Sequence, residues 1–210
     1  DKASLGLGVE LGEGQRHALK TALEHPLTVV TGGPGTGKTT IIRCLLEATG
    51  LPESRVALAA PTGRAAKRMS EATGIEAKTI HRLLEFNPIG ARFQRDESDP
   101  LDVDLLIVDE ASMVDLPLFD SLMRAILDTC RVIFVGDVDQ LPPVGPGAPL
   151  TELIRSETVP VVRLREIYRQ GAGSTIIDVA HGIQRGQSPE VTPPGTTIQD
   201  FYFIHREEPA

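Results

Sequence analysis

A glycine-rich segment near the start of the chain carries residue types that bind phosphate. Residues 32–39 read GGPGTGKT and fit the pattern G-x-x-x-x-G-K-[ST] between two apolar stretches. Glycines let backbone N–H groups turn toward phosphate oxygens, and the N-terminus of a following helix adds positive charge. We expect Lys38 to reach the outer phosphates and the Thr39 hydroxyl to bind Mg²⁺. The predicted nucleotide-binding residues of this loop are Gly33, Pro34, Gly35, Thr36, Gly37, Lys38, Thr39 and Thr40.

Two carboxylates follow the apolar run at residues 105–108. By itself, an apolar run that ends in Asp-Glu is also typical of a solvated strand end. Together with the phosphate loop, it predicts that Asp109 holds Mg²⁺ and that Glu110 orients and activates an attacking water. The presence of both acids favours hydrolysis over phosphate binding alone.

The elements that must position these residues alternate between strands and helices. Short runs of Val, Ile and Leu predict buried strands at 27–31, 55–60, 105–109, 132–136 and 159–164. Amphipathic patterns between them predict helices at 13–24, 37–49, 63–73, 78–85, 115–128, 149–156 and 174–185. This alternation predicts an α/β fold with a mainly parallel sheet flanked by helices. Such sheets bind ligands at the carboxyl ends of their strands, where the loop and the carboxylates lie.

Two segments interrupt the alternation. Residues 86–100 contain Pro88, Gly90 and Pro100 and are predicted to form a small inserted hairpin or long loop. Residues 186–197 are rich in Pro, Gly and Thr and read as a connector, which another short strand at 201–204 follows.

Composition bounds the class of protein. The 210 residues are 40% hydrophobic and 24% charged, which excludes a disordered, collagen-like or membrane-spanning chain. Cys44 and Cys130 do not form a C-x-x-C pair, so we expect two buried, reduced thiols and a cytoplasmic location. No secretory signal is visible and the chain begins at Asp1, so we expect a piece cut from a larger protein.

Charge is distributed unevenly along the chain. The net charge of −8 argues against a simple polyanion-binding protein. However, residues 55–95 hold eight Lys and Arg against three Glu, whereas residues 96–120 hold nine acids and no base. The first block is consistent with nucleic-acid binding and the second with a metal–phosphate site.

Four further motifs point to a family. They are VGDVDQLPPV at 135–144, LREIYRQ at 164–170, APTGRAAKR at 60–68 and KTIHRLL at 78–84. With the phosphate loop and the Asp-Glu pair, this set resembles the superfamily 1 DNA helicases, most closely the RecD-like branch that runs 5′ to 3′. The resemblance extends from about residue 12 to residue 206.

The resemblance implies ATP and Mg²⁺ as cofactors and assigns further roles. Gln15 matches the family's adenine-reading glutamine, and Gln140 the glutamine that senses the γ-phosphate and couples it to DNA. Arg169 matches the arginine that contacts the γ-phosphate. Tyr168 is placed either to stack on the adenine or to pack in the core.

The resemblance also implies a path for single-stranded DNA and for junctions of single and double strands. Its first part is Pro61, Thr62, Gly63, Arg64 and Lys67, with Arg68 on the same helix face; its second is Thr79, His81 and Arg82. Aromatic residues make up only 4% of the chain, so we expect weakly sequence-specific, salt-dependent binding. The insertion at 86–100 is either a duplex-splitting pin, with Phe86, Arg92, Phe93 and Arg95 as its wedge, or a plain surface loop.

The family's engine has two RecA-like domains, and only the first is recognisable here. We expect residues 1–85 and 101–206 to form this P-loop NTPase domain, with 86–100 inserted and the second domain absent. An isolated first domain would hydrolyse ATP poorly, because the cleft is half built. Two alternatives stay open: the helicase portion of a conjugative relaxase, and a nucleotide-gated single-strand-binding module without catalysis. Recombination or repair partners are also implied by the resemblance.

Overall fold

The computed structural model describes residues 8–166, 175–184 and 186–188. Two compact units divide the chain at residues 168 and 169. In the second unit the described helix is α8 (Thr175–Gln184); everything below concerns the first unit. The prediction that one RecA-like domain continues to residue 206 stays a prediction.

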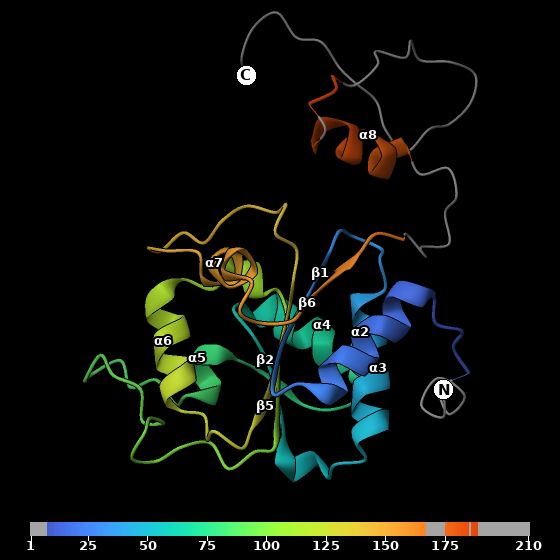
Figure 1. Cartoon of the computed structure of the whole chain (residues 1–210). Coiled ribbons are helices and arrows are strands. Elements are labelled where there is room, and N and C mark those ends of the chain that lie inside the picture. The colour runs from blue at the N-terminus through green and yellow to red at the C-terminus, as the bar shows by residue number, and fades with distance from the viewer. Residues whose placement is uncertain (1–7, 167–174, 185, 189–210) are drawn as a thin grey trace, which may run out of the picture. The chain divides into compact units, whose positions relative to one another are not determined.

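Six parallel strands form one sheet, which explains why most of the runs are apolar throughout: both faces are covered. The strands are β1 (Leu27–Gly32), β2 (Val56–Ala60), β3 (Ala77–Thr79), β4 (Leu105–Val108), β5 (Arg131–Gly136) and β6 (Val161–Leu164). Their order is β3-β2-β4-β5-β1-β6, and each pair of neighbouring strands runs parallel. The predicted α/β fold with a mainly parallel sheet is therefore confirmed (Figure 1).

Alternate strand residues point into two cores, one on each face of the sheet. Val30, Ile107 and Ile133 pack with apolar residues of α2 (Glu13–Glu24), α3 (Lys38–Thr49) and α4 (Gly63–Thr73). Their neighbours Val29, Leu106 and Phe134 pack with α5 (Ile80–Leu83), α6 (Leu116–Arg124) and α7 (Pro149–Ser156). Figure 1 shows α2 and α3 on one side of the sheet and α5 and α6 on the other.

Three predicted helices, at 13–24, 63–73 and 149–156, have the expected bounds. The predicted helix at 78–85 is wrong in its first part, because Ala77 and Thr79 pair with Leu58 and Ala60 as strand β3 before α5 begins. The predicted helix at 115–128 ends at Arg124, where the chain turns and Ala125 accepts a hydrogen bond from Leu101.

The segment at 86–100 forms two tight antiparallel contacts, Asn87 with Arg92 and Asp96 with Asp99. Short 3₁₀ turns occur at Glu53–Arg55 and Ala111–Met113. Within the described part of the chain, no helix is both long and apolar enough to cross a bilayer.

Candidate functional site

The carboxyl ends of three neighbouring strands form the edge at which the predicted chemistry gathers. β5 lies between β1 and β4, and all three are parallel. The loops that follow them therefore leave the sheet at the same edge. This order places the segment of Gln140 between the phosphate loop and the Asp109–Glu110 pair. Sequence spacing alone does not predict that arrangement.

The phosphate loop is built on left-handed glycines. Gly35 and Gly37 have φ values of 80° and 82°, a region that other residues seldom adopt. Gly37 is also the N-cap of α3 and supplies no side-chain cap, so the first N–H groups of the helix are left for an anion. Lys38 Nζ donates hydrogen bonds to the carbonyls of Gly32 at 2.6 Å and Gly33 at 3.0 Å. A bound phosphate would compete with these two carbonyls for the ammonium group.

The other predicted residues of the loop differ in exposure. Thr36 is buried, at 2% exposed, and its hydroxyl donates to the carbonyl of Gly33 at 2.9 Å. Pro34 and Thr39 are exposed, whereas Thr40 is half-buried on α3. The Thr39 hydroxyl is therefore accessible to a ligand at the first turn of the helix.

The two carboxylates after β4 lie in an unfavourable setting for charge. Burial raises the pKa of Asp109, which the Glu110 backbone N–H and Lys38 partly offset. Burial and the neighbouring Asp109 raise the pKa of Glu110, and Asp137 adds to this effect. Glu110 also has a positive φ of 52°, and its Oε2 atom is buried without a hydrogen-bond partner. Strain and an unsatisfied buried oxygen are features that concentrate at functional sites.

Asp137, which the sequence reasoning did not single out, holds the Gln140 segment. It is 1% exposed and follows β5 directly. Its carboxylate accepts hydrogen bonds from the backbone N–H of Asp139 at 3.1 Å and from Nε2 of Gln140 at 3.2 Å. The available signal was an Asp directly after the apolar run at 132–136. The contact restrains the Gln140 side chain next to the end of β5, although Gln140 itself is exposed.

The oxygen atoms at this edge fit a magnesium ion. Thr39 and Asp109 offer a hydroxyl and a carboxylate, and Mg²⁺ is usually held by one or two protein oxygens together with phosphates and water. Among the described residues, no group of three or more His, Cys, Asp and Glu is arranged to hold a metal without such help. The unpartnered Oε2 of Glu110 is a further polar atom that bound water would satisfy.

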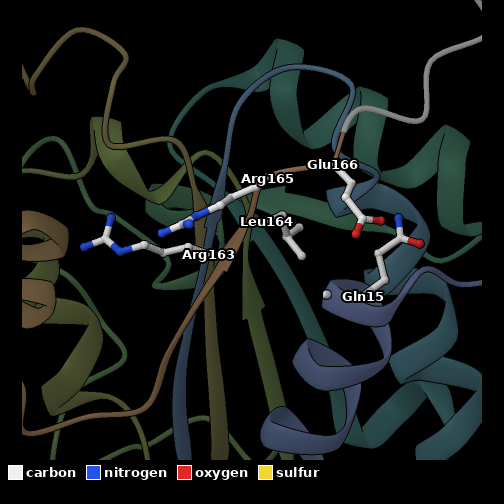
Figure 2. A pocket seen from close by; sticks show the side chains of 6 residues that line it. Gln15, Arg163, Leu164, Arg165 and Glu166 are labelled. Atoms are coloured by element: carbon white, nitrogen blue, oxygen red, sulfur yellow. The ribbon is translucent and has the colours of Figure 1, made fainter.

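A pocket of about 190 Å³ lies beside the loop, between the start of α2 and the end of β6. Its lining residues are Gly14, Gln15, Arg163, Leu164, Arg165 and Glu166. Figure 2 shows Gln15, Leu164 and Glu166 on one side of β6, and the guanidinium groups of Arg163 and Arg165 on the other. On the side of Leu164, the pocket therefore combines one apolar side chain with the polar side chains of Gln15 and Glu166.

Helix α4 carries the first part of the predicted DNA path. The Thr62 hydroxyl accepts a hydrogen bond from the Ala65 backbone N–H at 3.3 Å, so it caps the helix. Pro61 is half-buried before it and Gly63 begins the helix. The exposed cations on α4 are Arg64, Lys67 and Arg68. Because α4 follows β2, which pairs in parallel with β4, the start of this basic helix lies at the same edge of the sheet as Asp109 and Glu110.

The second part of the path joins the insertion. Thr79 caps α5 by accepting from the Arg82 backbone N–H at 3.2 Å. The exposed His81 ring contacts Phe86 and Phe93, each at a centroid distance of 5.6 Å. The two phenylalanine rings lie 5.1 Å apart. The structure therefore brings a predicted DNA contact and two predicted wedge residues into one aromatic cluster.

The two remaining wedge candidates, Arg92 and Arg95, differ in their contacts. Arg95 donates to Glu85 at 2.8 Å and to Asp99 at 3.1 Å, which fastens the base of the insertion, whereas Arg92 is exposed. The most exposed apolar side chain here is Ile89, at 98%, which the sequence reasoning missed. The sequence signal for this exposed position was the run Pro88-Ile89-Gly90, which is typical of a turn. Two further predicted site residues, Tyr168 and Arg169, lie outside the described residues.

A family model described as an AAA domain matches residues 15–146. Those residues include the phosphate loop, the Asp109–Glu110 pair and Gln140. The chain belongs to this domain family. Together with its relatives, the match identifies it as a superfamily 1 helicase motor domain of the RecD-like branch. The predicted first RecA-like motor domain is thereby confirmed.

Relatives of this RecD-like motor domain are considerably longer proteins. It is 46% identical over 182 residues to the ATP-dependent RecD2 DNA helicase of Deinococcus radiodurans, a match over 85% of this chain and 24% of that protein. It is 40% identical over 224 residues to the RecBCD enzyme subunit RecD of Mycobacterium tuberculosis, covering 93% and 38%. The matched region thus spans 24% of the first relative and 38% of the second.

Solved structures of helicases share the fold of this motor domain. Pif1 helicase from Candida albicans matches with a TM-score of 0.68 and 25% identity, over 87% of this chain and 45% of that one. Bacteroides Pif1 bound to single-stranded DNA matches with a TM-score of 0.62 and 26% identity, over 86% and 47%.

Proposed function

We propose that this chain is the nucleotide-hydrolysing motor domain of an ATP-dependent, 5′-to-3′ DNA helicase that moves along single-stranded DNA. The strand order carries the proposal, because it brings the phosphate loop, the Asp109–Glu110 pair and Gln140 to one edge of the sheet. Helix α4, which carries exposed cations, starts at that edge, because it follows β2 and β2 pairs in parallel with β4. The similarity to a RecD2 helicase and to a RecBCD subunit supports the same function.

Hydrolysis at this edge is a phosphoryl transfer to water. Lys38 leaves its two carbonyls and holds oxygens of the γ-phosphate. Glu110 orients the water and accepts its proton, while the water oxygen bonds to the γ-phosphorus and the bond to the β–γ bridging oxygen breaks. When bound by Thr39 and Asp109, Mg²⁺ neutralises charge on the phosphates. Gln140, held by Asp137 at 3.2 Å, is assigned to detecting whether the γ-phosphate is present.

The rest of the assignment concerns partners. Single-stranded DNA and its junctions with duplex bind across α4 and α5, and the insertion at 86–100 splits the duplex. Arg169 and a second RecA-like domain complete the cleft, and recombination or repair proteins are the expected partners. Two buried free thiols, Cys44 and Cys130, support a reducing cytoplasm. Neither the relaxase nor the non-catalytic alternative gains support from the relatives' names.

The test is the Mg·ATP hydrolysis rate at low salt, with and without oligo-dT. We expect weak turnover that oligo-dT stimulates. Lys38→Ala should remove nucleotide binding, whereas Glu110→Gln should keep binding and lower turnover by at least about 100-fold, the usual contribution of a general base. Lys20→Ala, an exposed lysine on α2, is the matched control and should change neither quantity.

Two results would count against the proposal. A wild-type chain that binds no labelled Mg·ATP would overturn it outright. A chain that binds ATP and DNA, shows no turnover even when joined to its second domain, and retains full DNA affinity after Glu110→Gln would favour the non-catalytic module instead.

A further inference from the structure

Two buried side-chain oxygens in the described part of the chain have no hydrogen-bond partner, and both follow strand β4. They are Oε2 of Glu110 and Oγ of Ser112. The proposed hydrolysis step gives Glu110 a partner, the attacking water, but it gives Ser112 none. Ser112 is only 9% exposed, and a buried hydroxyl without a partner costs free energy. An unpaired polar atom beside a proposed catalytic residue points to a role in the reaction.

The backbone holds Ser112 in place without help from its side chain. Ser112 lies in the 3₁₀ turn Ala111–Met113, for which Glu110 is the N-cap residue. The Met113 N–H donates to the Glu110 carbonyl at 3.1 Å, which closes the turn. Serine side chains in turns commonly bond to a nearby backbone group, but the Ser112 hydroxyl does not. The hydroxyl therefore plays no part in holding the turn.

The same turn packs against the end of β5, from which the Gln140 segment departs. A Cβ on Gly136 would lie 3.1 Å from the Ser112 backbone nitrogen. The next residue, Asp137, accepts the hydrogen bond from Gln140 at 3.2 Å. Ser112 therefore lies where the segment that carries Glu110 meets the segment that carries Gln140.

We propose that Ser112 is a positioning residue for ATP hydrolysis, and that its hydroxyl gains a partner when Mg·ATP and the attacking water occupy this edge of the sheet. The hydroxyl then donates to the water molecules around the Glu110 carboxylate and restrains that carboxylate toward the γ-phosphate. This inference rests on the proposed function, because it assumes that Glu110 activates a water. The free chain bears the cost of the unpaired hydroxyl, and the reacting complex gains from it.

Ser112→Ala removes the hydroxyl alone, so one change should have two effects of opposite sign. Without nucleotide and metal, the variant should melt at a higher temperature than the wild type, because an unpaired buried oxygen is gone. With saturating Mg·ATP and oligo-dT, kcat should fall by about 10-fold, as loss of a supporting hydrogen bond around a metal site produces. Affinity for labelled Mg·ATP should stay within about 2-fold of wild type, since the hydroxyl acts in the reacting complex.

Two further variants serve as controls. Ser112→Thr keeps a hydroxyl and should recover turnover relative to Ser112→Ala. In Ser121→Ala the lost hydroxyl is a paired one, which donates to the Pro117 carbonyl at 2.9 Å on α6. This variant should melt no higher than the wild type and hydrolyse ATP at the wild-type rate. Turnover is measured in this chain and, where the isolated domain is too slow, in the full-length protein.

The outcomes separate the inference from the proposed function. Unchanged turnover in Ser112→Ala, weakened binding of Mg·ATP, or a melting temperature no higher than that of the wild type would each overturn the inference. A wild-type chain that binds no Mg·ATP would overturn the proposed function itself, and the inference with it. Full turnover after Glu110→Gln would do the same.

Discussion

The backbone conformation of Glu110 and the burial of its carboxylate are both energetically unfavourable in the folded chain. Its backbone is left-handed at φ 52°, and one of its carboxylate oxygens is buried without a partner. Burial and Asp109 both raise its pKa. A carboxylate that is costly to ionise is also a stronger base toward water than an exposed one. The same features that suit Glu110 to accept a proton therefore reduce the stability of the folded chain.

This opposition gives a prediction about pH. Folding raises the pKa of Glu110, because burial and Asp109 disfavour its charged form. Below the unfolded pKa, about 4.3, Glu110 is protonated in both states and does not destabilise the fold. As pH rises through the folded pKa, the folded chain loses this stability. In metal-free buffer at pH 7.5, Glu110→Gln should therefore melt at a higher temperature than the wild type. The difference should vanish below about pH 4.

Thermal melts between pH 3.5 and 8 check this expectation. Glu47→Gln, an exposed glutamate on α3, serves as the control and should show no such trend. A Glu110→Gln variant that melts below the wild type at pH 7.5, or by a constant difference at every pH, would contradict it.

At the scale of elements, the loop that carries Gln140 is anchored at its far end on helix α6. Asp115 caps that helix by accepting from the Leu118 N–H at 3.0 Å, and Pro146 accepts from the Leu116 N–H at 2.9 Å. A Cβ on Gly145 would lie 1.9 Å from the Asp115 carboxylate. The loop and the cap therefore occupy one tight contact that only glycine permits.

Gly145→Ala should disrupt that contact. The added Cβ would displace either the loop or the Asp115 side chain that caps α6. The loss of an N-cap costs about 1 kcal/mol. We expect the free energy of unfolding in urea to fall by about 1–2 kcal/mol. Gly63→Ala is the matched control, since a Cβ there meets nothing within 4 Å and its φ is not positive. Equal stabilities for the two variants would show that the contact is unimportant.

The same elements show what a sequence can and cannot predict. Helix α4 has the expected bounds because local signals mark both ends, Thr62 as its N-cap and Gly74 at φ 78° as its C-cap. Strand β3 was missed because it has only three half-buried residues, and its identity depends on pairing with β2. The motifs predicted the residues of the loop and the carboxylates. Asp137 was missed although its contacts with Asp139 and Gln140 are local. The placement of the Gln140 segment between the phosphate loop and the carboxylates depends on strand order, which no local pattern encodes.

At the scale of the whole molecule, a chain with a net charge of −8 presents basic residues where DNA is proposed to bind. Lys67 on α4 lies 3.9 Å from Glu71, and Lys20 on α2 lies 3.8 Å from Glu24. Both pairs have i,i+4 spacing and exposed side chains. Local geometry therefore does not distinguish the two lysines, and only their positions relative to the proposed DNA path differ.

Lys67→Gln should weaken binding of oligo-dT and reduce the slope of log affinity against log salt by about 0.7, the contribution of one phosphate contact on a single strand. Lys20→Gln should leave both quantities at wild-type values. Fluorescence anisotropy between 50 and about 300 mM salt measures them. Equal effects of the two substitutions would place the DNA elsewhere, because they would then reflect only the change in net charge.

The position of β1 within the sheet also governs how the chain assembles as it is synthesised. Both neighbours of β1 are encoded late: Leu27 pairs with Val132 and Val29 with Val161. At translation rates of about 5–20 residues per second, the roughly 100 residues between β1 and β5 take on the order of 5–20 s to be synthesised. During that interval the apolar strand β1 has no partner strand on either side, so it can aggregate or bind chaperones. Any expressed piece that stops before residue 131 leaves the strand that leads into the phosphate loop unpaired on both sides.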